Sequence, residues 1–201
     1  ASDVYKRQLL LRSGALPAPL EVLEERTVGA GLGSDSIREG ITASIIGLIA
    51  VIVFMVLAYG LFGIFTTVTV LMNLFLMLGA LSFMGATLTL PGIAGIILTI
   101  GMAVDANVLI FERMREEVKN GRSTKDAAEA GFTEAWGTIV DSNLTTLVAA
   151  FVLFYFGTGP VRGFAVTLAI GIATSMFTSV TVTRLIIASW LNKYKPTKLP
   201  I

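Results

Sequence analysis

Residues 40–104 form one continuous stretch without a charged side chain. A soluble globular domain does not tolerate such a run, because about a quarter of its residues are charged. A membrane-spanning helix needs roughly 20 consecutive apolar residues, so the stretch holds two spans and most of a third. Over the whole chain 54% of residues are hydrophobic and only 14% are charged, which places the chain in the membrane class.

Short turns rich in glycine divide the apolar sequence into predicted spans. They are expected at about residues 41–59, 65–83, 92–111, 137–156 and 163–190. The sequence therefore predicts an all-α polytopic membrane protein, with a transmembrane bundle over residues 40–192 and a tail over residues 193–201. Glycines within the third and fifth spans are typical of helices that pack closely in lipid.

A charged segment, residues 112–136, separates the third span from the fourth. Asn120-Gly121 is expected to break it into two short helices. Ser123, followed by Asp126 three residues later, resembles a capping box with Asp in place of the usual Glu. We therefore expect the second of these helices to begin at Ser123.

The first 39 residues differ from the rest because they are polar and punctuated by Pro and Gly. Their short apolar runs predict one or two strands with loops. Residues 9–39 are too few to bury a core of their own, so we expect them to be the end of a larger α+β domain. The chain does not open with a signal-peptide pattern, which favours a sequence that starts inside a longer protein.

The orientation follows from the basic side chains near the ends of the spans. Those on one side of the membrane lie in the charged segment and the tail: Arg113, Arg115, Lys119, Arg122, Lys125, Lys193, Lys195 and Lys198. The short turns of the opposite side carry Arg162 alone. By the positive-inside rule the tail faces the cytoplasm and residues 1–39 face the periplasm.

Asp105 is the exceptional residue of the third span, seven residues before Glu112. At 1.5 Å per residue it lies about 10 Å inside the cytoplasmic boundary. A charge in lipid is costly, so this side chain should face the bundle or a water-filled path. Burial disfavours the charged form, so such an acid can bind a proton from one side and release it to the other. The alternative is a neutral acid that only holds helices together.

Asp141 repeats the pattern at the start of the fourth span, and each acid heads a similar triplet, Asp105-Ala106-Asn107 and Asp141-Ser142-Asn143. The two acids are expected at similar depth on neighbouring helices. Within each triplet, Asp and Asn point about 200° apart around the helix, so the four side chains cannot all face one partner. Asp141 can equally be a hydrated carboxylate at the membrane interface.

Other polar residues of the spans have simpler interpretations. Thr145 and Thr146 follow Asp141 by one turn, and they can bond a carboxylate or the backbone carbonyl four residues earlier. Asn73 is expected to form an interhelical hydrogen bond, and Arg184 to extend toward the cytoplasmic interface. The candidate proton relay is therefore Asp105, Asn107, Asp141, Asn143 and Thr145.

The chain has no His and no Cys, and no glycine-rich nucleotide loop follows a strand. A Cys/His metal site is excluded, and an enzyme or a nucleic-acid binder is not expected. We predict no cofactor. The energy for transport must therefore come from a gradient or a partner.

Several stretches resemble the SecD branch of the SecD/SecF family of bacterial protein-export membrane proteins. They are LRSGALPAP and EERTVG at residues 11–19 and 24–29, LPGIAG at 90–95, VDANVLIFER at 104–113, and GTGPVRGFA at 157–165. The likeness covers about residues 9–195. Residues 1–8 match nothing in the family and are treated as a non-native leader.

The resemblance implies membership of the resistance–nodulation–division superfamily, whose half-transporters have six helices and a large periplasmic domain after the first. This chain would hold five of the six helices and a remnant of that domain. The family implies a subunit of the bacterial inner membrane that uses the proton-motive force in late preprotein translocation. It also implies Asp105 as proton carrier, SecF, YajC and the SecYEG channel as partners, and SecA as a functional partner. Without the periplasmic domain, this segment is not expected to bind preprotein.

Two other functions remain compatible with the residues. One is half of a proton-driven exporter of small molecules or lipids from the same superfamily. The other is an assembly subunit without transport of its own.

Overall fold

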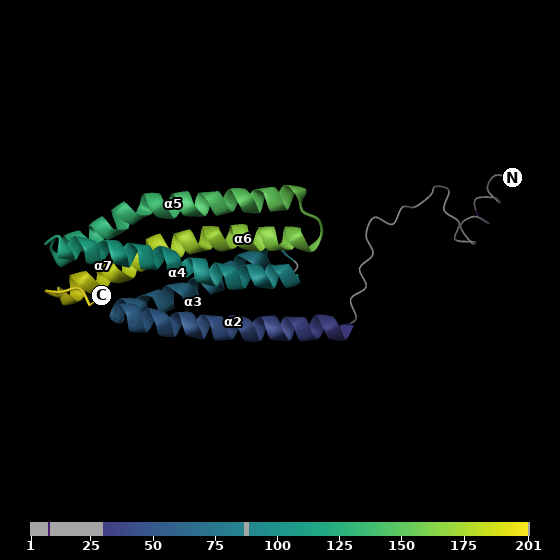
Figure 1. Ribbon diagram of the computed structural model, residues 1–201, viewed down its shortest axis with the longest axis horizontal. Coiled ribbons are helices and arrows are strands. Elements are labelled where there is room, and N and C mark those ends of the chain that lie inside the picture. Colours follow the sequence, from purple (N-terminus) through teal and green to yellow (C-terminus); the bar gives the residue numbers. More distant parts are fainter. Residues whose placement is uncertain (1–7, 9–29, 87–88, 201) are drawn as a thin grey trace. The chain divides into compact units, whose positions relative to one another are not determined.

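The computed structural model describes residue 8, residues 30–86 and residues 89–200. The chain divides into two compact units, Ala1–Ser34 and Asp35–Ile201. The strands and loops expected before residue 30 lie outside the described residues. Within the second unit, long helices run alongside one another (Figure 1).

The described helices follow the expected spans in order. They are α2 (Ala30–Tyr59), α3 (Leu61–Phe83), α4 (Leu90–Lys119), α5 (Thr124–Phe156) and α6 (Pro160–Phe177), then the π-helix η1 (Thr178–Val182) and α7 (Thr183–Tyr194). The segment Pro160–Tyr194 forms one continuous span, and four further segments are long and apolar enough to cross a membrane. Over the residues that the structure describes, the predicted five-span helical protein is confirmed.

The helices are longer than the predicted spans. The two short helices expected in residues 112–136 are continuations of α4 and α5, separated by a turn at residues 120–123. Residues 30–39, expected to belong to a strand-and-loop segment, instead form the start of α2. Helix extension is cooperative and no proline lies between residues 20 and 90, so polar residues continue a helix that the apolar run initiates.

Ser123 caps α5 as predicted. Its side chain accepts a hydrogen bond from the backbone N–H of Asp126 at 3.3 Å, and its hydroxyl donates to Oδ2 of Asp126 at 2.6 Å. A capped first turn satisfies backbone donors that would otherwise lack partners.

The α2–α3 connection depends on two glycines. Gly60 has φ of 55°, a conformation that side chains disfavour. A Cβ atom on Gly63 would overlap the backbone carbonyl of Met55. The two helices therefore reverse direction within a turn that is closed to larger residues.

Helix α4 is the centre of the second unit. It packs against α5 and α6, which also contact each other, and α3 contacts α4, α6, η1 and α7. In α4 56% of the most apolar segment is buried, against 6% in α2 and 11% in α5. Apolar faces of α2 and α5 are therefore exposed within the described part of the chain.

Glycines bring α4 and α6 close together, as their positions predicted. A Cβ atom on Gly95 would lie 3.2 Å from the Thr167 side chain, and one on Gly171 would overlap the Thr99 side chain. Gly101, in contrast, has no neighbour within 4 Å of such an atom, so it does not serve this packing.

We expect Gly171→Ala to lower the thermal unfolding midpoint in detergent micelles. Thr99 is fully buried and its hydroxyl donates to the Gly95 carbonyl at 2.8 Å, so it cannot easily move aside. Overpacking costs about 1–3 kcal/mol. Gly79→Ala is the control, because its Cβ meets nothing within 4 Å and Ala favours a helix by up to ~1 kcal/mol. Equal stabilisation by both variants would contradict the close α4–α6 contact.

Candidate functional site

A groove between α4 and α5 contains Asp105 and combines polar with apolar side chains. Its polar lining comes from Asp105 and Glu112 of α4 and from Ser142, Asn143 and Thr146 of α5; Met102, Ala106, Val108, Leu109 and Ile139 complete it. Asp105 is exposed within the described part of the chain rather than enclosed. The carboxyl group is thus accessible at a surface that α4 and α5 form together.

The α5 side chains of the groove are held by their own helix. The Asn143 Nδ2 donates to the Ile139 carbonyl at 2.8 Å, and the Ser142 hydroxyl donates to the same oxygen at 3.2 Å. The Thr146 hydroxyl donates to the Ser142 carbonyl at 3.1 Å. Because the hydroxyl donors of Ser142 and Thr146 and one N–H of Asn143 are occupied, the side-chain oxygens remain available as acceptors for a protonated acid or for water.

Asn107 lies on the opposite side of α4 from the groove. It is 1% exposed, its Nδ2 donates to the Ala103 carbonyl at 3.2 Å, and its Oδ1 accepts from the Thr183 hydroxyl at 2.9 Å. Thr183 is the first residue of α7, directly after η1. Asn107 therefore joins α4 to α7, and the predicted divergence of Asp105 and Asn107 around the helix is observed.

Asp141 and Thr145 do not line the groove either, and both are exposed. The Thr145 hydroxyl donates to the Asp141 backbone carbonyl at 2.9 Å, which is the backbone alternative considered for it. Since Ser142 and Asn143 do line the groove, Asp141 lies at a depth similar to that of Asp105, with its side chain directed elsewhere. Of the five candidate relay residues, the structure brings Asp105 and Asn143 together.

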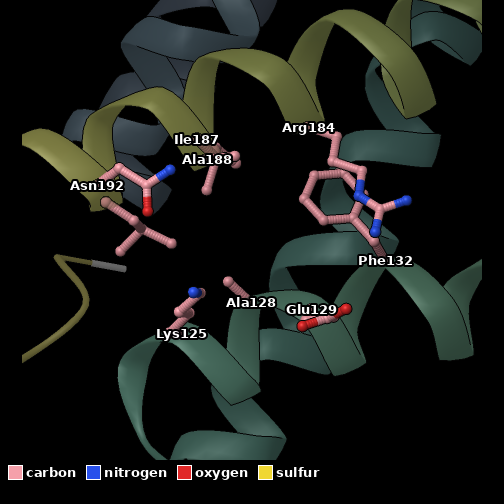
Figure 2. Close-up of a pocket in the computed structure, with 9 residues that line it drawn as sticks. Lys125, Ala128, Glu129, Phe132, Arg184, Ile187, Ala188 and Asn192 are labelled. Carbon is pink, nitrogen blue, oxygen red and sulfur yellow. The ribbon is translucent and has the colours of Figure 1, made fainter.

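Two other polar residues of the spans occupy different surroundings. Asn73 is buried in α3, but its Oδ1 has no hydrogen-bond donor among the described residues, so the expected interhelical bond through this atom is not found there. The Arg184 guanidinium lies 6.0 Å from the Phe132 ring centroid, in a groove between α5 and α7 that also contains Lys125 and Glu129 (Figure 2). An Arg at this distance gains a weak cation–π attraction.

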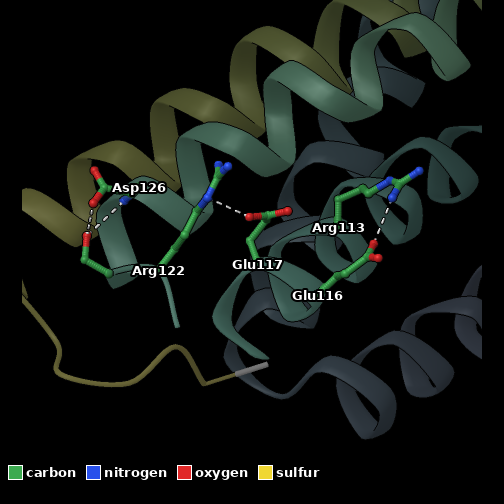
Figure 3. A network of polar contacts seen from close by, with 6 residues as sticks. Arg113, Glu116, Glu117, Arg122 and Asp126 are labelled. Atoms are coloured by element: carbon green, nitrogen blue, oxygen red, sulfur yellow. Dashed lines mark hydrogen bonds and ion pairs between the residues drawn. The ribbon is translucent and has the colours of Figure 1, made fainter. Parts of the chain in front are cut away.

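Ion pairs surround the turn between α4 and α5 (Figure 3). The Arg122 Nε lies 2.8 Å from Oε2 of Glu117, whose side chain is 9% exposed. Arg113 and Glu116 form a second pair at 2.8 Å on the exposed surface of α4. The exposed pair adds at most about 1 kcal/mol, whereas the pair of Arg122 and Glu117 links the turn to the end of α4.

Sequence reasoning missed two groove residues, Glu112 and Ser142. Glu112 was assigned to the membrane boundary, although a spacing of seven residues places it almost directly below Asp105 on the same helical face. Ser142 is the central residue of the second triplet and shows no signal of its own. Among the described residues, no three acidic side chains lie close enough to hold a metal ion.

The sequence model of a family described as "Protein export membrane protein SecD/SecF, C-terminal" matches residues 14–193. This chain belongs to the SecD/SecF family. Similar relatives are the protein translocase subunits SecD of Koribacter versatilis, 56% identical over 195 residues, and of Calditerrivibrio nitroreducens, 55% identical over 193 residues. The matches cover 97% and 96% of this chain but only 36% and 37% of the relatives. The chain thus spans about a third of the length of SecD proteins.

A solved SecD/SecF structure agrees in fold. The crystal structure of SecDF from Thermus thermophilus, described as a translocon-associated membrane protein, is 43% identical with a TM-score of 0.85. The match covers 98% of this chain and 27% of that chain. The similar relatives are named protein translocase subunits, so the resemblance seen in the sequence is confirmed.

We expect Thr183→Val to destabilise the bundle because it leaves the buried Oδ1 of Asn107 without its donor. Interhelical hydrogen bonds in membrane proteins contribute about 0.6–2 kcal/mol, which sets the expected loss. The matched control is Thr181→Val in η1, whose side chain is exposed. Chemical unfolding in micelles measures the free energy of unfolding of each variant. Equal stability of the two variants would show that the Asn107–Thr183 bond does not hold α4 against α7.

Proposed function

We propose that this chain is the membrane part of a SecD-type subunit that couples the proton-motive force to late steps of preprotein translocation. The observation that carries the proposal is Asp105, the one charged residue between Glu39 and Glu112. An ionisable residue within a span costs several kcal/mol unless it has a role or a partner. Its place in an open groove beside a second carboxylate, Glu112, supports proton exchange rather than a purely structural bond.

In this proposal the Asp105 carboxyl takes up a proton from the periplasmic side and releases it toward the cytoplasm. Asn143 and the α5 hydroxyls supply acceptors for the protonated form. Asn107 positions α4 by its bond to Thr183, while Asp141 and Thr145 are secondary members at the edge of the path. Directional proton transfer requires two states of the protein. In one state protons reach Asp105 from the periplasm, and in the other they leave it toward the cytoplasm.

The partners follow from the same assignment. SecF supplies the second half of the bundle and covers the α4–α5 groove, because the acid is exposed when this chain stands alone. SecYEG, YajC and SecA are the further components with which the complete subunit works. The chain lies in the bacterial inner membrane, with residues 1–39 periplasmic and residues 193–201 cytoplasmic.

We expect Asp105→Asn, made in the full-length subunit, to abolish the dependence of export on the proton gradient while assembly with SecF continues. Asn keeps the volume and hydrogen bonding of the side chain but carries no titratable proton. The measurement is preprotein uptake into inverted membrane vesicles with and without a proton gradient. Asp141→Asn is the comparison, and we expect a smaller effect since Asp141 lies outside the groove. Gradient-dependent export by Asp105→Asn at the normal rate would overturn the carrier assignment.

The orientation has its own test. The chain has no Cys, so single cysteines report on one site each within it. We expect a membrane-impermeant maleimide to label Thr158→Cys, in the α5–α6 turn, from the periplasm of intact spheroplasts. Asn120→Cys, in the α4–α5 turn, should react only after the membrane is permeabilised. The reverse pattern would show the opposite orientation.

A further inference from the structure

Glu112 shares a groove with Asp105 and is the second carboxylate of its lining. The two lie seven residues apart on α4, which places them on one face about 10 Å apart along the helix axis. This distance is too long for a direct hydrogen bond, so transfer between them requires intervening water. Glu112 lies nearer the charged end of α4, so it occupies the cytoplasmic mouth of the groove.

The Glu112 carboxylate is held through one oxygen. Its Oε1 accepts a hydrogen bond from the Tyr59 hydroxyl at 2.8 Å and another from Nη1 of Arg115 at 2.8 Å. Its Oε2 has no hydrogen-bond donor among the described residues. Two donors on one oxygen orient the group and leave the other oxygen available for proton exchange.

Arg115 and Tyr59 belong to a fixed arrangement. Nη2 of Arg115 donates to the Ala58 carbonyl at 2.7 Å, and its guanidinium carbon lies 4.7 Å from the Tyr59 ring centroid. The end of α2 is thereby tied to α4 at the position of Glu112. The titratable and charged groups around Glu112 are Tyr59 from α2 and, from α4, Asp105, Arg113, Arg115, Glu116 and Lys119. The α5 residues of the groove are uncharged.

We propose that Glu112 is the proton-exchange group at the cytoplasmic mouth of the groove, receiving through water the proton that Asp105 releases. The Asp105 carboxyl loses the proton, the Glu112 carboxylate gains it, and Glu112 then returns it to cytoplasmic water. This inference rests on the proposed role of Asp105 and names the next group in the same path. The competing view is that Glu112 only anchors the end of α2.

The test is Glu112→Gln in the full-length subunit, reconstituted with SecF in proteoliposomes that contain a pH-sensitive dye. Gln still accepts from Tyr59 and Arg115, so the anchor is retained while the exchangeable proton is lost. Loss of a positioned proton-transfer group costs about 10²–10⁴ in rate. Because water can partly substitute, we expect proton flux at least about tenfold lower.

Three variants separate the explanations. Tyr59→Phe removes one of the two bonds that orient Oε1 but keeps the Glu112 carboxylate, so proton flux should fall less than in Glu112→Gln. Glu116→Gln is the matched control, one turn further along α4, paired with Arg113 and outside the groove. Glu112→Asp restores a titratable group and should recover part of the flux. Equal losses in Glu112→Gln and Tyr59→Phe would assign Glu112 to anchoring and overturn the proposal.

Failure of this inference is distinguishable from failure of the proposed function. Normal flux in Glu112→Gln together with no flux in Asp105→Asn would refute the role of Glu112 alone, and would mean that Asp105 exchanges directly with water. Normal flux in both variants would refute the carrier assignment itself.

Discussion

Hydrocarbon offers no hydrogen bonds to the backbone, and this constraint governs the whole chain. Residues 40–104 contain no charge, and as helices they satisfy their own amides within the membrane. Helices in lipid associate through close packing and a few polar contacts rather than through the hydrophobic effect. Gly95 and Gly171 accordingly hold α4 and α6 in close contact, where larger residues would collide with Thr167 and Thr99.

The two faces of α4 make different contacts. One face carries Asn107 and is joined to α7 by the Thr183 hydroxyl at 2.9 Å. The other carries Asp105 and Glu112 in the groove shared with α5. A helix fixed on one side can present an acid on the other at a defined position. The π-helix η1 lies directly before Thr183, and π-bulges are frequent at functional sites.

The end of the bundle near the α4–α5 turn is organised by aromatic and ionic contacts around α4. The Phe62 ring lies 5.3 Å from that of Phe111 and 5.9 Å from that of Trp190, so α3, α4 and α7 meet there. The bonds of Tyr59 and Arg115 to Glu112 add α2 to the same region. The groove, which contains Glu112, thus opens beside the region where α2, α3, α4 and α7 meet.

The amino-acid sequence alone determined the five helical spans and the family, and it singled out Asp105, because apolar length, an isolated charge and the VDANVLIFER run are local properties. It also indicated that Asp105 and Asn107 diverge, since helical angles follow from spacing. It did not show how far α4 and α5 extend beyond the apolar core, because polar residues do not stop a helix. Only the tertiary structure decided which polar groups lie together: Asn143 lines the same groove as Asp105, Asn107 accepts a hydrogen bond from Thr183, and Asp141 lies outside the groove. Such choices depend on how neighbouring helices are rotated about their axes, and that rotation is set by packing between segments distant in the sequence.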